Sequence, residues 1–441
     1  MKTLLLRATL LFLVTTTTTQ SADVLFDVKV DFPVGDGPSA VFAADLDGDG
    51  LDDLAVANLY SSSISILLSN GDRTFTTTSF ASTPEPYSVC AADLNGDGFD
   101  DLAVADRQAV YAAVMLNNGD GTFGSPANYV AGIEPWTVVA ADLDDDGDKD
   151  LAVANGQSDD VAILLNDGDG TFVNSGYYAA GDWPHSVFAA DLDSDNDQDL
   201  MVPNWDSHDI SVILNNGDGT FAAPVSYAPV HYAAAVCAAD FDDDGDLDMA
   251  AVSTFHNRAA IFFNDGNGVF SYPIEYITGA WPYSVVAADF DGDRDIDVAT
   301  ANNSAHTVSV LPNNGDGTFA SVVDFETGND PFKITYGDFD GDGDYDLATA
   351  NFEADSVSVF FNLSDIPITC CRNAGDVNHD GQVDLLDFQF LRDYLHQDGP
   401  EPPCFEEADV DFVGEITSGD MSCLARYFFS KGNPCDPGGC P

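Results

Sequence analysis

Basic residues are scarce in this sequence. Lys and Arg together number 13 against 76 Asp and Glu, which gives a formal net charge of −63 at pH 7. Such a charge repels phosphate backbones and anionic lipids, so nucleic acid and anionic membrane surfaces are excluded as partners. Glu is scarce as well, because only nine of the acids are Glu and 67 are Asp. Solubility could use either acid, whereas a tight cation-binding loop needs the shorter Asp side chain.

Long apolar runs are also missing. The stretch from Leu4 to Val14 is too short to span a bilayer, and it lies between Lys2 and the small residues Ser21-Ala22. Residues 1–22 are therefore predicted to be a secretory signal, and the protein to be secreted or at the cell surface, with no membrane span. The sequence contains no nucleophile elbow, no phosphate-binding loop and no zinc-ligand spacing.

Cysteine is nearly confined to one end of the chain. Six of the eight Cys lie in the last 72 residues, where a small segment can build little core, so disulfide bonds are predicted there with their pairing open. These six are Cys370, Cys371, Cys404, Cys423, Cys435 and Cys440. Cys90 and Cys237 occupy the same position of two repeats and are predicted to be buried thiols.

Aspartate-rich loops are the dominant feature of the remaining sequence. Seven loops of the form D-x-[DN]-x-D-x-x-x-D begin at intervals of 48 and then 49 residues. They place oxygen side chains at positions 1, 3, 5 and 9, and a hard cation that takes six to eight oxygens needs such a convergence. We therefore predict about seven Ca²⁺ ions, one for each loop.

The predicted metal ligands are, loop by loop, Asp45, Asp47, Asp49 and Asp53; Asp93, Asn95, Asp97 and Asp101; Asp142, Asp144, Asp146 and Asp150; Asp191, Asp193, Asp195 and Asp199; Asp240, Asp242, Asp244 and Asp248; Asp289, Asp291, Asp293 and Asp297; and Asp338, Asp340, Asp342 and Asp346. Asn196 and Arg294 replace the sixth-position Gly of loops four and six. Because Arg is less comfortable than Gly in a left-handed turn, site six is the weakest of the seven predictions.

Short β-rich runs separated by Gly, Asn and Asp turns predict four strands in each repeat. Seven such sheets form an all-β, seven-bladed propeller over residues 23–363. The seventh repeat stops at Phe361-Asn362, without the Phe that closes the turn in the other repeats. In those repeats the Phe lies 18 or 19 residues before the first Asp of the next loop, and Phe26 lies 19 residues before Asp45. The N-terminal strand is therefore predicted to complete the last blade and close the ring.

These repeats resemble the FG-GAP or VCBS repeats of integrin α-chain propellers and of many secreted bacterial proteins. The resemblance covers about 340 residues and implies the propeller fold and its calcium sites. It implies little about the ligand.

A second module follows a linker at residues 364–374. An EF-hand-like loop offers Asp376, Asn378, Asp380, Asp384 and Asp387, and a weaker copy starts at Asp409, where Val413 replaces the position-5 ligand. The paired loops resemble a type I dockerin, which implies a small α-helical domain at residues 375–441, one or two further Ca²⁺ ions, and a cohesin-type scaffold as partner.

Aromatic residues are concentrated on one predicted face of the ring. The strand direction puts the Asp loops on one face, and it puts the loops that carry all four Trp and all five propeller His on the other. Flat aromatic rings suit sugars or an extended peptide, although they could equally be packing caps between blades. The predicted ligand-binding residues are Tyr87, Trp136, Trp183, His185, Trp205, Trp281, Tyr283 and Phe332.

The leading interpretation is a secreted, calcium-binding interaction or adhesion module whose propeller binds a glycan or an extracellular protein. An alternative is a polysaccharide-degrading enzyme, a lyase or a glycosidase, built on a calcium-bearing propeller. A third is a purely structural spacer. The predominance of metal loops and the lack of a catalytic motif favour the first.

Overall fold

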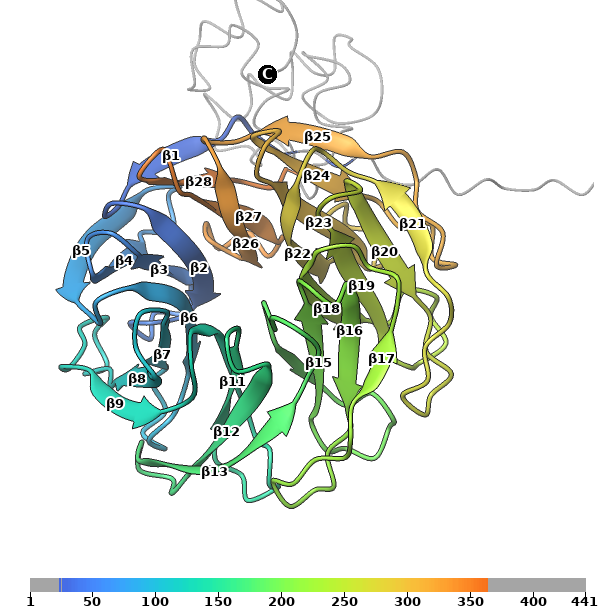
Figure 1. The fold of residues 1–441 in the computed structure, drawn as a ribbon. Coiled ribbons are helices and arrows are strands. Elements are labelled where there is room, and N and C mark those ends of the chain that lie inside the picture. Colours follow the sequence, from blue (N-terminus) through green and yellow to red (C-terminus); the bar gives the residue numbers. More distant parts are fainter. Residues whose placement is uncertain (1–23, 25, 364–441) are drawn as a thin grey trace, which may run out of the picture.

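The protein is a ring of seven four-stranded antiparallel sheets in the computed structural model, which describes residues 24 and 26–363 (Figure 1). The seven-bladed propeller expected from the repeat is thus confirmed. Among the described residues, all regular secondary structure is β-strand. The predicted signal segment, the EF-hand-like loops and the Cys-rich tail lie outside the described residues.

The blades, numbered from the first Asp loop, have the following strands. Blade 1 contains β2 (Pro38–Ala44), β3 (Asp53–Asn58), β4 (Ser63–Ser69) and β5 (Phe75–Ala81), and blade 2 contains β6 (Pro86–Ala92), β7 (Asp101–Asp106), β8 (Tyr111–Met115) and β9 (Ala127–Val130). Blade 3 contains β10 (Pro135–Ala141), β11 (Asp150–Asn155), β12 (Asp160–Asn166) and β13 (Phe172–Ala179), and blade 4 contains β14 (Phe188–Ala190), β15 (Asp199–Asn204), β16 (Asp209–Ile213) and β17 (Val225–Tyr227). Blade 5 contains β18 (Ala233–Ala239), β19 (Asp248–Ser253), β20 (Arg258–Phe262) and β21 (Ile274–Ile277), and blade 6 contains β22 (Pro282–Ala288), β23 (Asp297–Asn302), β24 (Thr307–Leu311) and β25 (Val323–Glu326). Blade 7 contains β26 (Pro331–Gly337), β27 (Asp346–Asn351), β28 (Ser356–Phe360) and β1 (Val30–Pro33).

Burial follows the order of the strands within a blade. The second strand is buried along its whole length in every blade, as in β3 and β11, because neighbouring blades pack on both of its faces. Its Leu, Val and Ala residues form apolar clusters that span adjacent blades. The first strand of a blade is only partly buried, as β10 and β26 show, because it lines a central channel of about 430 Å³. The outer strand is mostly exposed.

The ring is closed by the N-terminal strand, as predicted. β1 pairs antiparallel with β28, from Val30 opposite Val359 to Pro33 opposite Ser356, and Figure 1 shows the two ends of the described chain meeting in this one blade. Phe26 forms an isolated bridge with Asn362 and packs edge-on against Phe325 at 5.3 Å between ring centroids. This pairing removes the free sheet edge that blade 7 would otherwise expose.

A recurring asparagine connects each blade to the Asp loop of the blade before it. Asn117, at the end of the third strand of blade 2, donates from Nδ2 to the carbonyl oxygen of Leu46 in loop one, at 2.8 Å. Five further Asn side chains make the equivalent bond: Asn166 to Leu94, Asn215 to Leu143, Asn264 to Leu192, Asn313 to Phe241 and Asn362 to Phe290. Where the ring closes, the hydroxyl of Ser69 donates to the carbonyl of Phe339 at 2.6 Å. Every loop is thereby held by its neighbour.

Two further sequence predictions concern the described residues. Cys90 and Cys237 are buried and unpaired, as expected from their shared repeat position. Within residues 24 and 26–363 there is no helix that is long and apolar enough to cross a membrane.

Candidate metal loops and aromatic face

The backbone of each Asp loop is wound around its own first carboxylate. In loop one, Asp45 accepts hydrogen bonds from the backbone N–H of Gly48 at 2.7 Å and of Gly50 at 3.0 Å. Gly48 and Gly50 have φ of 79° and 93°, a conformation that Gly adopts without a steric penalty. The loop therefore folds tightly because its ligand residue and its glycines cooperate.

The ninth-position Asp ties the loop to the blade. Asp53 is fully buried and accepts from the N–H of Leu46 at 2.9 Å and from the N–H of Ser69 at 2.7 Å. The equivalent residue is placed in the same way in the other loops, as Asp297 shows with Phe290 and Asn313. Burial raises the pKa of these carboxyls, although the backbone donors oppose the effect.

The rise in pKa is large at every ninth position. The pKa is raised to about 6 for Asp101, Asp150 and Asp248, to about 7 for Asp53 and Asp199, and to about 8 for Asp297 and Asp346, in each case mainly by burial. A bound cation would act in the opposite direction, because an opposite charge nearby favours the ionised carboxylate.

The predicted ligands converge, but not all to the same degree. Positions 1, 3 and 9 come within 4.8 Å of one another as Asp45, Asp47 and Asp53; Asp191, Asp193 and Asp199; Asp240, Asp242 and Asp248; and Asp289, Asp291 and Asp297. Loop three brings together positions 1, 3 and 5, which are Asp142, Asp144 and Asp146. In loop three as in the others, the fifth-position Asp also accepts from a backbone N–H of its own loop, as Asp146 does from Asp148 and Asp49 does from Leu51.

The third-position carboxylate provides the strongest test of whether a cation fits. In five loops one of its oxygens is buried and has no hydrogen-bond partner among the described residues, at Asp144, Asp193, Asp242, Asp291 and Asp340. A buried carboxylate oxygen without a partner is costly, and the same atom is missing its partner in loop after loop. A hard divalent cation held by positions 1, 3 and 9 would satisfy it, so the donor set fits calcium.

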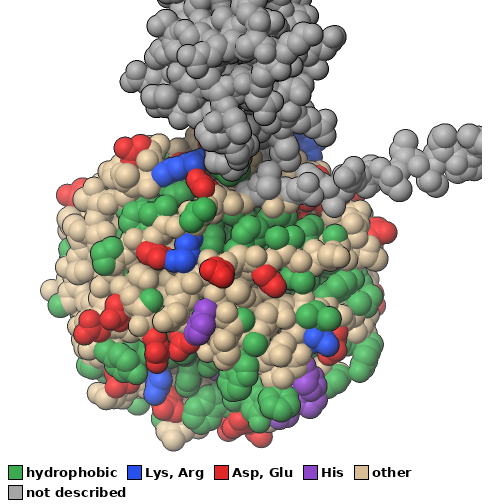
Figure 2. Space-filling model, turned by 90° about the horizontal axis from the view of Figure 1, so that it is seen from above, with side chains coloured by type: hydrophobic (Ala, Val, Ile, Leu, Met, Phe, Trp, Pro, Cys, Tyr) green, Lys and Arg blue, Asp and Glu red, His purple; other side chains and the backbone are tan. Residues whose placement is uncertain are grey.

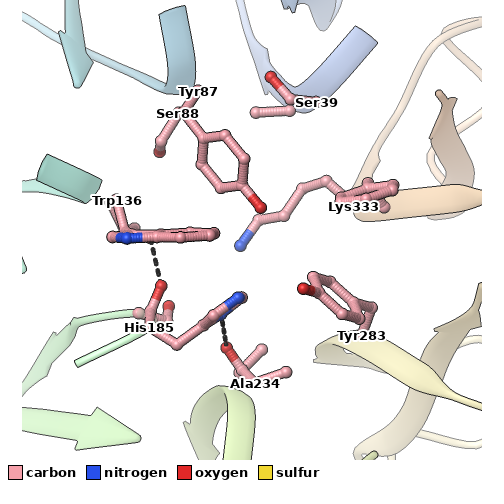
Figure 3. A pocket seen from close by; sticks show the side chains of 13 residues that line it. Ser39, Tyr87, Ser88, Trp136, His185, Ala234, Tyr283 and Lys333 are labelled. Atoms are coloured by element: carbon pink, nitrogen blue, oxygen red, sulfur yellow. Dashed lines mark hydrogen bonds between the residues drawn. The ribbon is translucent and has the colours of Figure 1, made fainter. Parts of the chain in front are cut away.

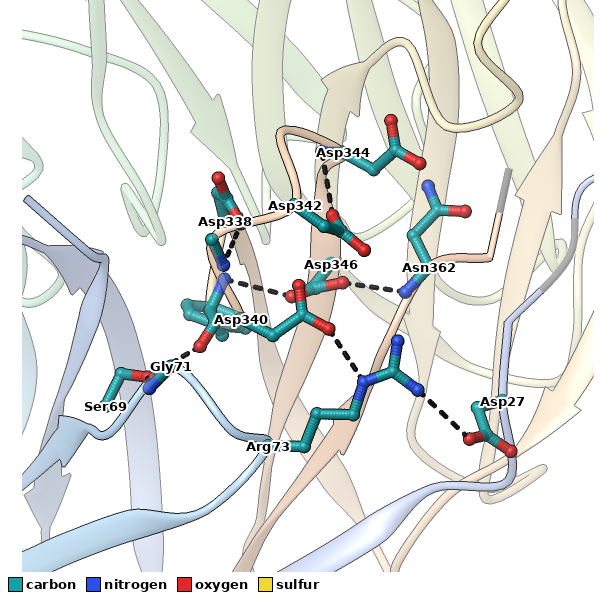
Figure 4. A network of polar contacts seen from close by, with 12 residues as sticks. Asp27, Ser69, Gly71, Arg73, Asp338, Asp340, Asp342, Asp344, Asp346 and Asn362 are labelled. Atoms are coloured by element: carbon teal, nitrogen blue, oxygen red, sulfur yellow. Dashed lines mark hydrogen bonds and ion pairs between the residues drawn. The ribbon is translucent and has the colours of Figure 1, made fainter. Parts of the chain in front are cut away.

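Two loops have features that bear on individual sites. In loop six, Arg294 occupies the sixth position at a φ of 80°, and its N–H donates to Asp289 at 2.8 Å, so the loop keeps its shape without Gly. At loop seven a cationic side chain comes from the neighbouring blade. Figure 4 shows Arg73 reaching from the β4–β5 turn to Asp340 and to Asp27, with its Nε 2.7 Å from an oxygen of Asp340.

Sequence reasoning missed Arg73, although a signal was present. Arg73 has a φ of 64° in a turn where the next five blades carry Gly. Those glycines are Gly121, Gly170, Gly219, Gly268 and Gly317. The ion pair of Arg73 with the nearly buried Asp340 offsets the strain of an Arg in a position that favours Gly.

Most of the residues predicted for the ligand face gather at one mouth of the channel, opposite the Asp loops. His185 is central: its ring centroid lies 4.8 Å from Trp136, 5.1 Å from Trp205 and 5.1 Å from Tyr283. The cluster extends through Trp136 to Trp183 and Tyr87, and through Tyr283 to Phe332. We call these seven rings the aromatic cluster. Trp281 is 44% exposed and makes no ring contact with any described residue.

The aromatic cluster surrounds a depression and a smaller recess. The depression has a volume of about 290 Å³ and is lined by Trp136, Trp183, His185, Trp205, Asp206 and Tyr283. Below it, a recess of about 30 Å³ shares Trp136, His185 and Tyr283 and adds the side chain of Lys333 (Figure 3). The depression is large enough for a sugar ring, whereas the recess has room for about two water-sized groups.

His185 is neutral in this setting. It is 6% exposed, and burial lowers its pKa to about 4. Its Nδ1 lies 2.9 Å from the carbonyl oxygen of Ala234, so Nδ1 carries the proton and donates it. Its Nε2 is then an acceptor, and it is buried with no hydrogen-bond partner in the described part of the chain.

Comparison with known families supports both modules. The FG-GAP-like repeat family matches residues 45–104, 93–153, 142–202, 203–251, 240–300 and 289–349, and the dockerin type I domain matches residues 374–429. No curated protein matches the sequence.

Comparison with solved structures concerns the fold alone. Virginiamycin B lyase from Staphylococcus aureus is 14% identical with a TM-score of 0.54, and the match covers 76% of this chain and 99% of that one. Hydrazine synthase from Kuenenia stuttgartiensis is 14% identical with a TM-score of 0.53, and the match covers 75% of this chain and 96% of that one. BBS1N, solved in complex with ARL6DN, is 13% identical with a TM-score of 0.54, covering 76% and 98% of the two chains.

Proposed function

This chain belongs to the FG-GAP-like repeat family, and from that premise we propose that it is an extracellular, calcium-stabilised binding module. Its propeller binds a glycan in the depression of the aromatic cluster. Its dockerin type I domain attaches it to a cohesin-bearing partner. Calcium at the Asp loops stiffens the opposite face and takes no part in recognition.

The observation that carries this proposal is the placement of aromatic rings where the fold does not require them. Trp183 has a φ of 61°, a left-handed conformation that is unfavourable for a bulky side chain and is favoured by Gly. The equivalent residue is Gly37 in blade 1, Glu134 in blade 3 and Asp330 in blade 7. Because the backbone accepts these residues, the ring of Trp183 serves something other than the turn.

Trp205 supports the same argument. It follows the last residue of β15, at a position that is Leu59, Gly156 or Asn303 in other blades. Its ring stacks on His185 at a centroid distance of 5.1 Å and an interplanar angle of 26°. Two rings held against each other leave a flat, pre-organised surface, which suits the apolar face of a sugar.

The experiment that tests the proposal substitutes Trp183→Gly. The ring is lost and the left-handed backbone is relieved, so the melting temperature is expected to stay the same or to rise. Affinity for any glycan identified on an array in saturating calcium should fall about tenfold or more, as for loss of a central aromatic anchor. A packing cap would behave in the opposite way, with lower stability and unchanged binding.

Glu134→Gly provides the matched control, because Glu134 has the same left-handed φ, at 57°, but carries no ring. It should gain as much stability as Trp183→Gly and bind normally. Incubation of the parent protein with neutral and acidic polysaccharides, followed by assay for new reducing ends and unsaturated products, distinguishes a binding module from an enzyme. Product formation that depends on the aromatic cluster would overturn the proposal.

A further inference from the structure

A single lysine interrupts the ring of small residues at the mouth of the channel. The position five residues before the first Asp of each loop is small in six blades, where it is Ala40, Ser88, Thr137, Ser186, Ala235 and Ser284. In blade 7 it is Lys333. Six of these seven positions line the recess, all but Ser284, and among the six only Lys333 carries a charged group.

Lys333 has no counter-ion among the residues that the structure describes. It makes no hydrogen bond or ion pair with any described residue, and no carboxylate lines the recess into which it points (Figure 3). Burial lowers the pKa of Lys333, since an ammonium group in apolar surroundings loses its hydration. In a protein of net charge −63 that has 76 acids available, a partly buried cation without a counter-ion among the described residues is conspicuous. An unpaired buried charge is unfavourable unless an opposite charge arrives with a ligand.

His185 adds a second group with an unused hydrogen-bonding site. Figure 3 shows its ring beside Lys333, and its Nε2, which is an acceptor in this tautomer, has no partner among residues 24 and 26–363. Among the groups that line the recess are therefore a cation and an acceptor that have no polar partner among the described residues. A ligand that satisfies both has a carboxylate for Lys333 and a neighbouring hydroxyl group that donates to His185.

We propose that the recess binds the carboxylate of a terminal uronic acid, while the sugar ring stacks against the aromatic cluster in the depression above. This inference rests on the proposed glycan-binding function and names its ligand class. The recess has a volume of about 30 Å³, which suits the two oxygens of a carboxylate and little more. A uronic acid carries the required hydroxyls next to its carboxylate, and a simple anion does not.

The rest of the glycan is neutral. Asp206 lines the depression and is exposed, and Asp182 is exposed beside Trp183. The ring seen from its edge in Figure 2 shows acidic side chains dispersed over the surface and few Lys or Arg. A polyanionic chain would place further carboxylates against these acids, so the site fits one acidic residue at the end of a neutral chain.

Calorimetric titration of the full chain in saturating calcium tests this inference. The probes are oligosaccharides that end in glucuronic, galacturonic or mannuronic acid, each with its parent that has an alcohol at C6. At least one acid should bind tenfold or more tightly than its parent. Lys333→Met removes the charge and keeps the length, so it should reduce that preference to within twofold while leaving the affinity of the parent unchanged. Its melting temperature should not fall, because a buried charge is removed.

The outcomes separate the two proposals. Equal binding of acid and parent, or a preference that survives in Lys333→Met, overturns the uronic acid inference and leaves the glycan-binding function standing. If the protein binds neither member of any acid–parent pair and no glycan on the array, both proposals are overturned. A peptide with a free C-terminal carboxylate, compared with its amide, provides the remaining arm: Lys333-dependent binding of the peptide in place of the sugars would assign the recess to a protein ligand.

Discussion

Replacing Arg73 by Gly should weaken the closure of the ring, and by more in the absence of calcium than in its presence. Arg73 joins three parts of the chain: its own turn in blade 1, Asp340 of loop seven at 2.7 Å, and Asp27 before β1 at 3.5 Å. The Asp340 side chain is only 6% exposed, so without Arg73 a nearly buried carboxylate loses its cation.

The expected loss of folding stability in Arg73→Gly follows from opposing effects. At an effective dielectric constant of about 20, two charges about 4 Å apart attract by about 4 kcal/mol. The Arg73 side chain is 35% exposed, so solvent screens part of this attraction, and its ordering costs up to about 2 kcal/mol. Relief of the left-handed backbone returns about 1–2 kcal/mol, which the greater freedom of Gly in the unfolded chain partly cancels. The net loss should be about 1–2 kcal/mol in metal-free protein.

Calcium changes the result because the bound ion neutralises the Asp340 carboxylate in place of Arg73. Differential scanning calorimetry should show Arg73→Gly melting a few degrees below the parent after removal of calcium and close to it at saturation, and calcium titration should show tighter binding at one site. Arg294→Gly is the control, because Arg294 has a φ of 80° but forms no ion pair with the described residues. Equal losses for the two variants, or a loss for Arg73→Gly that calcium does not alter, would refute the role of the ion pair.

The structure makes three further predictions. In metal-free protein the free energy of unfolding should rise as the pH falls from about 8 towards 4, because folded carboxyls such as Asp297 and Asp346 have a pKa raised to about 8. In excess calcium the bound carboxylates have depressed pKa values, so the same fall in pH should lower the free energy of unfolding. Urea unfolding at several pH values tests both, and a pH dependence of the same sign with and without calcium would contradict the prediction. Deletion of residues 24–34 should expose the edge of β28 and cause aggregation, whereas a truncated chain that stays monomeric in light scattering and melts like the parent would contradict the closure. Cys90 and Cys237 should resist iodoacetamide in the native protein, because burial raises the pKa of each thiol to about 12, and mass spectrometry that found rapid alkylation of the folded chain would show that the blades open more readily than their packing indicates.

The sequence predicted what repeats and missed what occurs once. The 49-residue period, the loop signature and the displaced Phe26 were enough to predict seven blades and the strand that closes them, because each is imposed by backbone geometry. The joint position of Tyr87, Trp136, His185 and Tyr283 also followed from the repeat register.

Arg73 and Lys333 were missed because each is a single departure from a repeated pattern, and its meaning depends on the residues of another blade. Lys333 acquires its setting from His185 and Tyr283, which are distant in sequence. Trp281 shows the reverse case: it shares the loop position of Trp183, but it does not line the depression and is 44% exposed. The position of a residue in the repeat does not by itself predict which equivalent side chains contact one another.

The pairing of β28 has a mechanical consequence. The chain leaves the propeller towards the dockerin match from β28, which is hydrogen-bonded to β27 on one side and to β1 on the other. If the tail is held by a cohesin-type partner and the propeller by the ligand proposed above, tension enters the ring through this strand. Two ladders then share the load, whereas a strand at the rim of a blade would have only one. The N-terminal segment that closes the ring therefore also reinforces the point from which it is pulled.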